Sequence, residues 1–180
     1  AFQGSEHDVL DRHYQCAIQY DADPILRITS DCPLIDPLLV EKMLQIFLKN
    51  NYDYVTNREP PTFPDGLDTE IISFSALKKT ARYAKMSSER EHVTSYITKN
   101  SNKFKIFNHR NKKDLSHLRW TVDEKQDLDF VKKIYFQMKP KTLFSTNAVL
   151  KILAKEPSLL NINQGIIRNE GYAKSLKNDR

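Results

Sequence analysis

The fold class is decided by the stretch Ile25-Leu26-Arg27-Ile28-Thr29-Ser30-Asp31-Cys32-Pro33-Leu34-Ile35-Asp36-Pro37. Its first five residues include β-branched and aliphatic side chains, which favours a strand over 25–29. Asp36 and Pro37 then predict the start of a helix, because the carboxylate can cap free backbone amides and proline has the right φ for the first helical position. A strand that passes through a short loop into a helix is typical of α/β folds.

The same alternation of strand and helix continues on both sides of this stretch. Apolar spacing predicts helices over 6–20, 75–85, 88–99 and 147–155 and from residues 37 and 123, and strands over 52–56, 69–74, 103–107 and 118–122. We therefore expect a layered α/β fold with a mostly parallel sheet. Residues 57–66 hold three prolines and predict a long surface loop, which is a frequent place for functional residues.

Composition limits the class of protein. The 180 residues predict a single domain over 1–180, with a polar C-terminal extension over 161–180. No apolar run approaches the roughly 20 residues of a membrane span. The four glycines lie too far apart for a phosphate-binding glycine-rich loop. Two cysteines provide neither a disulfide framework nor a four-thiolate zinc site, so we expect a cytoplasmic protein.

Two aspartates follow strands of the expected sheet. Asp31 comes after the strand over 25–29, and Asp123 comes after the strand over 118–122. Ligands of open α/β sheets collect beyond the carboxyl ends of the strands, and Mg²⁺ accepts one or two carboxylates together with water and phosphate oxygens. The pair is therefore a candidate magnesium site. An aspartate before a helix is also commonly a cap, and Asp123 with Gln126 fits a capping box.

Further candidates lie in the same segments. Arg27 and Arg119 lead into the two aspartates and could bind phosphate or form structural ion pairs. The long loop and its end supply candidate sugar-binding or dimer contacts, or merely solvated charges, at Asn57, Arg58, Asp65, Asp68 and Glu70. His92 and Tyr96 share a helix face, where the imidazole could act near neutral pH or simply pack.

A basic segment favours a different class of partner. Its members are Lys99, Lys103, Lys105, His109, Arg110, Lys112 and Lys113. They could neutralise nucleic-acid phosphates. Charged residues that alternate with Phe104 and Ile106 are equally typical of an edge strand protected from aggregation, which is the interpretation we prefer; we expect no nucleic-acid partner.

The chain resembles the cytidylyltransferase family. The resemblance lies in segments 2–12, 27–36, 64–70 and 119–124, in the motif Arg90-Glu91-His92-Val93-Thr94, and in the terminal segment 168–176, all in matching order. The most similar branch is the spore coat polysaccharide biosynthesis protein F type, which is related to the acylneuraminate and KDO cytidylyltransferases.

The resemblance implies a nucleotide-diphospho-sugar transferase fold of the GT-A, Rossmann-like type. It implies transfer of CMP from CTP to a sugar or sugar acid with release of pyrophosphate, in polysaccharide or surface glycan synthesis, by a homodimer. The family's Mg²⁺ ligands fall on Asp31 and Asp123. Family members begin with a strand and a loop carrying Gly, Arg and Lys that hold the triphosphate, so we expect that this chain lacks the first βα unit. Either the sequence is a truncated product of a longer enzyme, or the protein has lost nucleotidyl transfer. A nucleotide-sugar-dependent glycosyltransferase is the nearest alternative.

Overall fold

A mixed sheet forms the centre of the molecule. The computed structural model describes residues 1–166, 168, 170–177 and 179, and within them the strands form one four-stranded sheet in the order β1-β3-β2-β4. The strands are β1 (Ile25–Arg27), β2 (Tyr54–Thr56), β3 (Glu70–Ile72) and β4 (Ile106–Asn108). The helices are α1 (Val9–Gln19), α2 (Pro37–Lys49), α3 (Phe74–Tyr83), α4 (Ser87–Glu91), α5 (Ser95–Lys99), α6 (Lys125–Met138), α7 (Thr146–Lys155) and α8 (Glu170–Lys177), with short 3₁₀ turns at Ser101–Lys103 and Pro157–Asn161.

The prediction of a mostly parallel sheet is wrong, and the error comes from β3. This strand pairs antiparallel with both β1 and β2, whereas β2 and β4 are parallel. Strands β1, β2 and β4 therefore run in one direction and β3 runs against them. Between β2 and β3 the chain forms a loop without a crossover helix, so it returns in the opposite direction.

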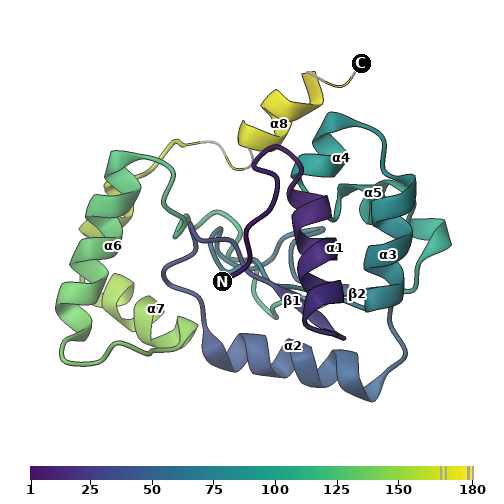
Figure 1. Ribbon diagram of the computed structural model, residues 1–180. Coiled ribbons are helices and arrows are strands. Elements are labelled where there is room, and N and C mark those ends of the chain that lie inside the picture. Colours follow the sequence, from purple (N-terminus) through teal and green to yellow (C-terminus); the bar gives the residue numbers. More distant parts are fainter. Residues whose placement is uncertain (167, 169, 178, 180) are drawn as a thin grey trace.

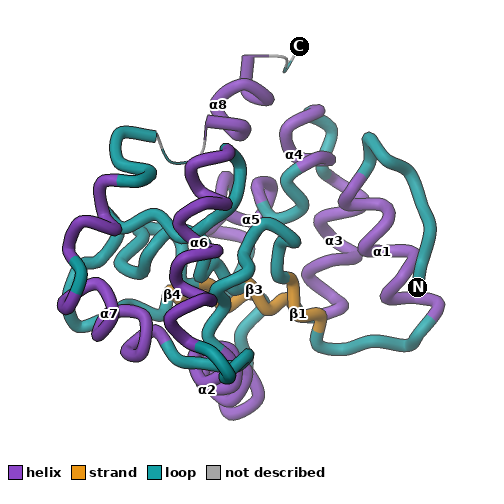
Figure 2. Tube along the Cα trace, turned by 90° about the vertical axis from the view of Figure 1, so that its left-hand side faces the viewer, coloured by secondary structure: helices purple, strands orange, loops and turns teal. Residues whose placement is uncertain are grey.

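Helices cover both faces of the sheet (Figure 1). Side chains alternate between the faces along each strand, so Val55 and Ile71 point to one side while Tyr54 and Ile72 point to the other. Helix α2 packs on the first side and contacts β2 and β3. Helices α1, α3 and α5 supply the apolar cluster on the second side. In Figure 2 the labelled strands β4, β3 and β1 lie side by side, with α2 below them and α1 and α3 to their upper right.

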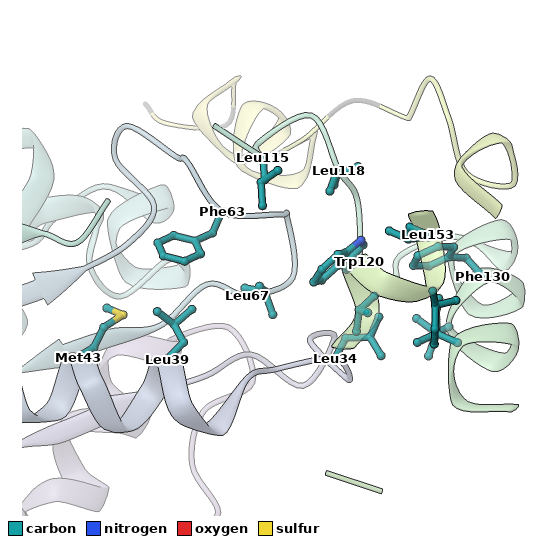
Figure 3. Close-up of a cluster of buried hydrophobic side chains, with 14 of the residues drawn as sticks. Leu34, Leu39, Met43, Phe63, Leu67, Leu115, Leu118, Trp120, Phe130 and Leu153 are labelled. Atoms are coloured by element: carbon teal, nitrogen blue, oxygen red, sulfur yellow. The ribbon is translucent and has the colours of Figure 1, made fainter. Parts of the chain in front are cut away.

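The larger core extends from α2 to the pair α6 and α7. Trp120 lies within it at 0% exposure, surrounded by Leu34, Leu67, Phe130 and Leu153 (Figure 3). The predicted surface loop 57–66 contributes to this core, because Phe63 is buried within it. In the described residues no helix is long and apolar enough to span a membrane.

Three predicted elements differ in detail. The expected helix 88–99 is broken into α4 and α5 around Val93, whose φ is +56°. The expected strand 118–122 makes a single parallel bridge between Arg119 and Asp65. Helix α6 is capped by Glu124, one residue after the expected Asp123. The predicted start of α2 is confirmed, because Asp36 accepts a hydrogen bond from the amide of Leu38 at 2.9 Å.

Candidate functional site

An open polar cleft of about 330 Å³ lies beyond the carboxyl end of β1 and the neighbouring start of β3. Three loops meet there: the loop after β1, the loop before β3 and the segment before α6. Helix α8 closes one side with Tyr172. From the sequence candidates the structure brings Arg27, Asp31, Arg58, Asp65, Asp68, Glu70, His92, Arg119 and Asp123 into the lining. A cleft at the ends of parallel strands is the usual ligand site of α/β folds.

Asp31 and Asp123 line the same cleft although 92 residues separate them in the sequence. The two segments are joined by the backbone, because the amide of Val122 donates to the carbonyl of Asp31 at 2.9 Å and the hydroxyl of Thr121 donates to the same oxygen at 3.1 Å. Neither aspartate caps a helix, since α2 and α6 are capped by Asp36 and Glu124. The capping interpretation is therefore wrong for both.

The donor set of this pair fits Mg²⁺. Two carboxylates suffice for an ion that takes its remaining ligands from water and phosphate. Asp123 is 54% exposed, and one of its oxygens accepts from Arg119 at 2.7 Å, which leaves the other oxygen for a ligand. No group of three or more His, Cys, Asp or Glu side chains in the described part of the chain could hold a metal. A bound ion would accordingly depend on substrate oxygens for most of its coordination.

Glu70 forms the buried charged floor of the cleft. Its carboxylate is 1% exposed and pairs with Arg27, with Arg58 at 3.5 Å, and with the hydroxyls of Tyr54 and, at 2.7 Å, Thr94. Burial opposes its ionisation, but the two arginines and the two hydroxyls overcome that penalty and lower the pKa of Glu70 to about 2. The floor is therefore a fixed carboxylate that holds two guanidinium groups in place.

Arg119 is the centre of a second network. It donates to Asp127 at 2.8 and 2.9 Å, to Asp123 at 2.7 Å and to Asp65 at 3.2 Å. Asp127 is fully buried and also accepts from the amides of Asp123 and Glu124. Burial works against its charge, while Arg119, Asn163 and these amides keep the pKa of Asp127 below its usual range. Arg119 thereby fixes the position of Asp123.

In two further carboxyl groups the pKa is shifted in the opposite direction, upwards. Burial raises the pKa of Asp65 and of Asp68, and Arg168 only partly offsets that effect. Arg168 contacts Asp65 at 3.4 Å and Asp68 at 2.7 Å. Asp65 and Asp68 lie beside the arginines, and their carboxylate oxygens can accept hydrogen bonds from hydroxyl groups.

The loop before β3 approaches the segment before α6 through Gly66. Its φ is +98°, and a Cβ atom there would lie 2.5 Å from the amide nitrogen of Thr121. The amide of Asp65 donates to Leu118 at 2.9 Å, and the amide of Trp120 donates to Asp65 at 2.7 Å. The glycine thus allows two backbones to meet where the cleft is formed.

Two predicted residues do not line the cleft. Asn57 is 1% exposed and bonds the backbone of Leu67 and Thr69, so it shapes the loop. Tyr96 is 8% exposed and packs edge-on against Phe104 in the second core. The lining residues that sequence reasoning missed are Thr29, Cys32, Gly66, Thr121, Glu124, Ile166, Gly171 and Tyr172; several are immediate neighbours of Asp31, Asp65 and Asp123, which was the available signal.

Strand β4 is an edge strand of the sheet, and Lys105 and His109 flank it, whereas Lys99 lies in α5 and Lys103 in the 3₁₀ turn. Lys99 lies 3.8 Å from Glu89 and 3.7 Å from Asp179, while Lys105 lies over the ring of Tyr52. Of these residues Lys105 fits the interpretation of a charge-protected edge, and the expectation of no nucleic-acid partner stays a prediction.

These features define a class: an α/β protein whose ligand cleft is lined by paired carboxylates and fixed arginines. A family model described as cytidylyltransferase matches residues 1–164, so the chain belongs to the cytidylyltransferase family.

The chain is also similar to individual proteins. The chain is 38% identical to an uncharacterized protein of Methanocaldococcus jannaschii, over 95% of this chain and 69% of that protein. It is 26% identical to the spore coat polysaccharide biosynthesis protein SpsF of Bacillus subtilis, over 87% of this chain and 65% of the relative. The structure of a cytidylyltransferase from Leptospira borgpetersenii superposes with a TM-score of 0.87 at 34% identity, covering 93% of this chain and 70% of that one. The expectation that a first βα unit is missing stays a prediction.

Proposed function

We propose that the protein transfers CMP from CTP to a sugar or sugar acid, with release of pyrophosphate, in the synthesis of a polysaccharide or surface glycan. The observation that carries this proposal is the meeting of Asp31 and Asp123 at one cleft within a cytidylyltransferase-family fold. The likeness to SpsF, a spore coat polysaccharide biosynthesis protein, supports the choice of pathway.

We further propose that Asp31 and Asp123 hold Mg²⁺. When bound, this ion would neutralise phosphate charge and make the α-phosphorus more electrophilic. The side chains around it have separate tasks. Arg27, Arg58 and Arg119 are held by buried carboxylates, so they present fixed positive charge to phosphate oxygens without reorganising. Asp65 and Asp68 accept hydrogen bonds from the sugar hydroxyls. The reaction therefore depends on positioning and charge complementarity.

The test measures pyrophosphate release by the whole protein with CTP, Mg²⁺ and a panel of neutral sugars and sugar acids. We expect release that requires both CTP and an acceptor. Asp31→Asn and Asp123→Asn should each lose this release, and Asp129→Asn is their matched control, because Asp129 is exposed on α6 and does not line the cleft. Turnover of a nucleotide sugar without pyrophosphate would contradict the proposal and favour a glycosyltransferase. The homodimer and the cytoplasmic location stay predictions; sedimentation of the purified protein tests the former.

A further inference from the structure

His92 lies at a strained turn on the wall of the cleft. Val93, between α4 and α5, has a φ of +56°, which is costly for a β-branched residue, and the amide of Thr94 donates to the carbonyl of His92 at 2.5 Å. The turn places Thr94 on Glu70 while His92 lines the cleft. Backbone strain of this kind persists where the surroundings enforce it, and it concentrates at functional sites.

The hydrogen bonds around His92 identify which ring nitrogen is free. Nε2 lies 2.9 Å from the hydroxyl of Ser175 on α8. The other two partners of that hydroxyl, Glu91 at 2.7 Å and the carbonyl of Gly171 at 3.1 Å, can only accept, so we assign the hydroxyl proton to one of them and the ring proton to Nε2. The neutral ring then carries its proton on Nε2. Nδ1 keeps an open lone pair, with no hydrogen-bond partner among the residues that the structure describes.

The surroundings keep the ring neutral at pH 7. Burial lowers the pKa of His92, and the nearby cations Arg27 and Arg58 lower it further. Glu91 and Asp179 act in the opposite direction but do not reverse the shift. Tyr172 of α8 packs edge-on against the ring, with the centroids 4.9 Å apart. A neutral imidazole held on two sides with one free nitrogen is suited to accept a proton.

We propose that Nδ1 of His92 is the general base that takes the proton of the acceptor hydroxyl during CMP transfer. The sugar oxygen forms a bond to the α-phosphorus as its proton passes to Nδ1. The bond from the α-phosphorus to the oxygen that bridges to the β-phosphate breaks, and pyrophosphate leaves with that electron pair. The proton then passes from Nδ1 to solvent. This role rests on the proposed function and adds to it the residue that activates the acceptor.

Ser175 is a positioning residue in this scheme. It acts through His92 by fixing the tautomer and the ring orientation. Ser175→Ala frees Nε2, so we expect a reduced kcat with CTP affinity retained, and a smaller loss than in variants of His92 itself.

The experiment compares His92→Gln and His92→Asn with the wild type in the pyrophosphate assay, across pH 5 to 9. General base catalysis contributes roughly 10²–10⁴-fold, so we expect kcat to fall at least about 100-fold while CTP binding, measured by calorimetry, changes little. The wild-type rate falls with decreasing pH as Nδ1 is protonated, and this dependence disappears in the variants. Added imidazole partly restores transfer by His92→Ala, which a purely structural role would not allow.

His109→Gln is the matched control. His109 is also partly buried, and burial likewise lowers its pKa, but it does not line the cleft. We expect its transfer rate and pH profile to match the wild type. Transfer by His92→Gln within threefold of wild type, or an unchanged acid limb, overturns the assignment of the base and leaves the proposed function intact. A wild type that neither binds CTP nor releases pyrophosphate overturns both.

Discussion

Burial has opposite energetic effects in the apolar core around Trp120 and in the charged floor around Glu70. Trp120 is 0% exposed and Glu70 is 1% exposed, so both side chains are removed from water. The first is surrounded by aliphatic and aromatic groups whose burial stabilises the fold. The second holds two arginines whose desolvation costs free energy that the ion pairs only offset. The core fixes the fold, whereas the floor fixes charges where a ligand can meet them.

The largest expected loss of stability comes from the apolar core. Phe130 of α6 is 1% exposed, and truncation to alanine removes its packing and leaves a cavity. We expect Phe130→Ala to lower the free energy of unfolding by about 3–5 kcal/mol, measured by urea denaturation. Phe136→Ala on the same helix is the control, because Phe136 is 71% exposed. Equal losses in the two variants would contradict the assignment of the core.

Removal of the buried Glu70 carboxylate is expected to lower the stability of the protein slightly less than Phe130→Ala does. Glu70→Gln leaves Arg27 and Arg58 without their shared anion, which we expect to destabilise the protein by about 3 kcal/mol and to weaken nucleotide binding. Glu41→Gln, an exposed position of α2, is the control and should change stability by less than about 0.5 kcal/mol.

The ionisation of Glu70 makes the stability of the protein depend on pH, and the lowered pKa of Glu70 gives the direction of that dependence. The pKa of Glu70 is about 2 in the folded state and close to 4.5 in the unfolded chain, so its stabilisation is present above pH 4.5 and is lost as the pH falls towards 2. We expect the acid limb of the stability curve to be less steep in Glu70→Gln. An identical acid limb in both proteins would show that Glu70 is not charged in the native state.

The sequence allowed the core to be predicted better than the floor. The positions of Leu39, Met43 and Phe47 follow from helical periodicity, which reports one-sided burial directly. The direction of β3 did not follow, because strand pairing depends on where a loop returns and not on the residues of the strand. Asp31 and Asp123 were expected to meet, but the arginine networks that hold the cleft join residues far apart in the sequence, and no spacing predicts them. Arg119 and Asp65 are 54 positions apart, and Arg168 and Asp68 are 100 positions apart.

Gly66 lies between the apolar core and the cleft, and its substitution is expected to cause the next smaller loss of stability. A methyl group at this position would contact the backbone of Trp120 and Thr121, and its φ of +98° is strained for alanine. We expect Gly66→Ala to cost about 1–3 kcal/mol and to displace the segment before α6, which reduces nucleotide affinity. Gly171→Ala is the control for stability, since nothing lies within 4 Å of its added Cβ. Unchanged affinity in Gly66→Ala would show that the two backbones need not touch.

The smallest effect on stability should come with the largest effect on function. Asp31 and Asp123 neither cap a helix nor belong to a core, and Asp123 is 54% exposed. We expect Asp31→Asn and Asp123→Asn each to shift the thermal midpoint by no more than a few degrees, which corresponds to about 1 kcal/mol or less. Each should nevertheless abolish the Mg²⁺-dependent part of CTP binding in calorimetry, because an amide is a poor ligand for a hard cation. Normal Mg²⁺-dependent CTP binding in both variants would contradict the assignment of Asp31 and Asp123 as metal ligands. The charged groups of the cleft that bind nucleotide would then be the arginines held by Glu70 and Asp127.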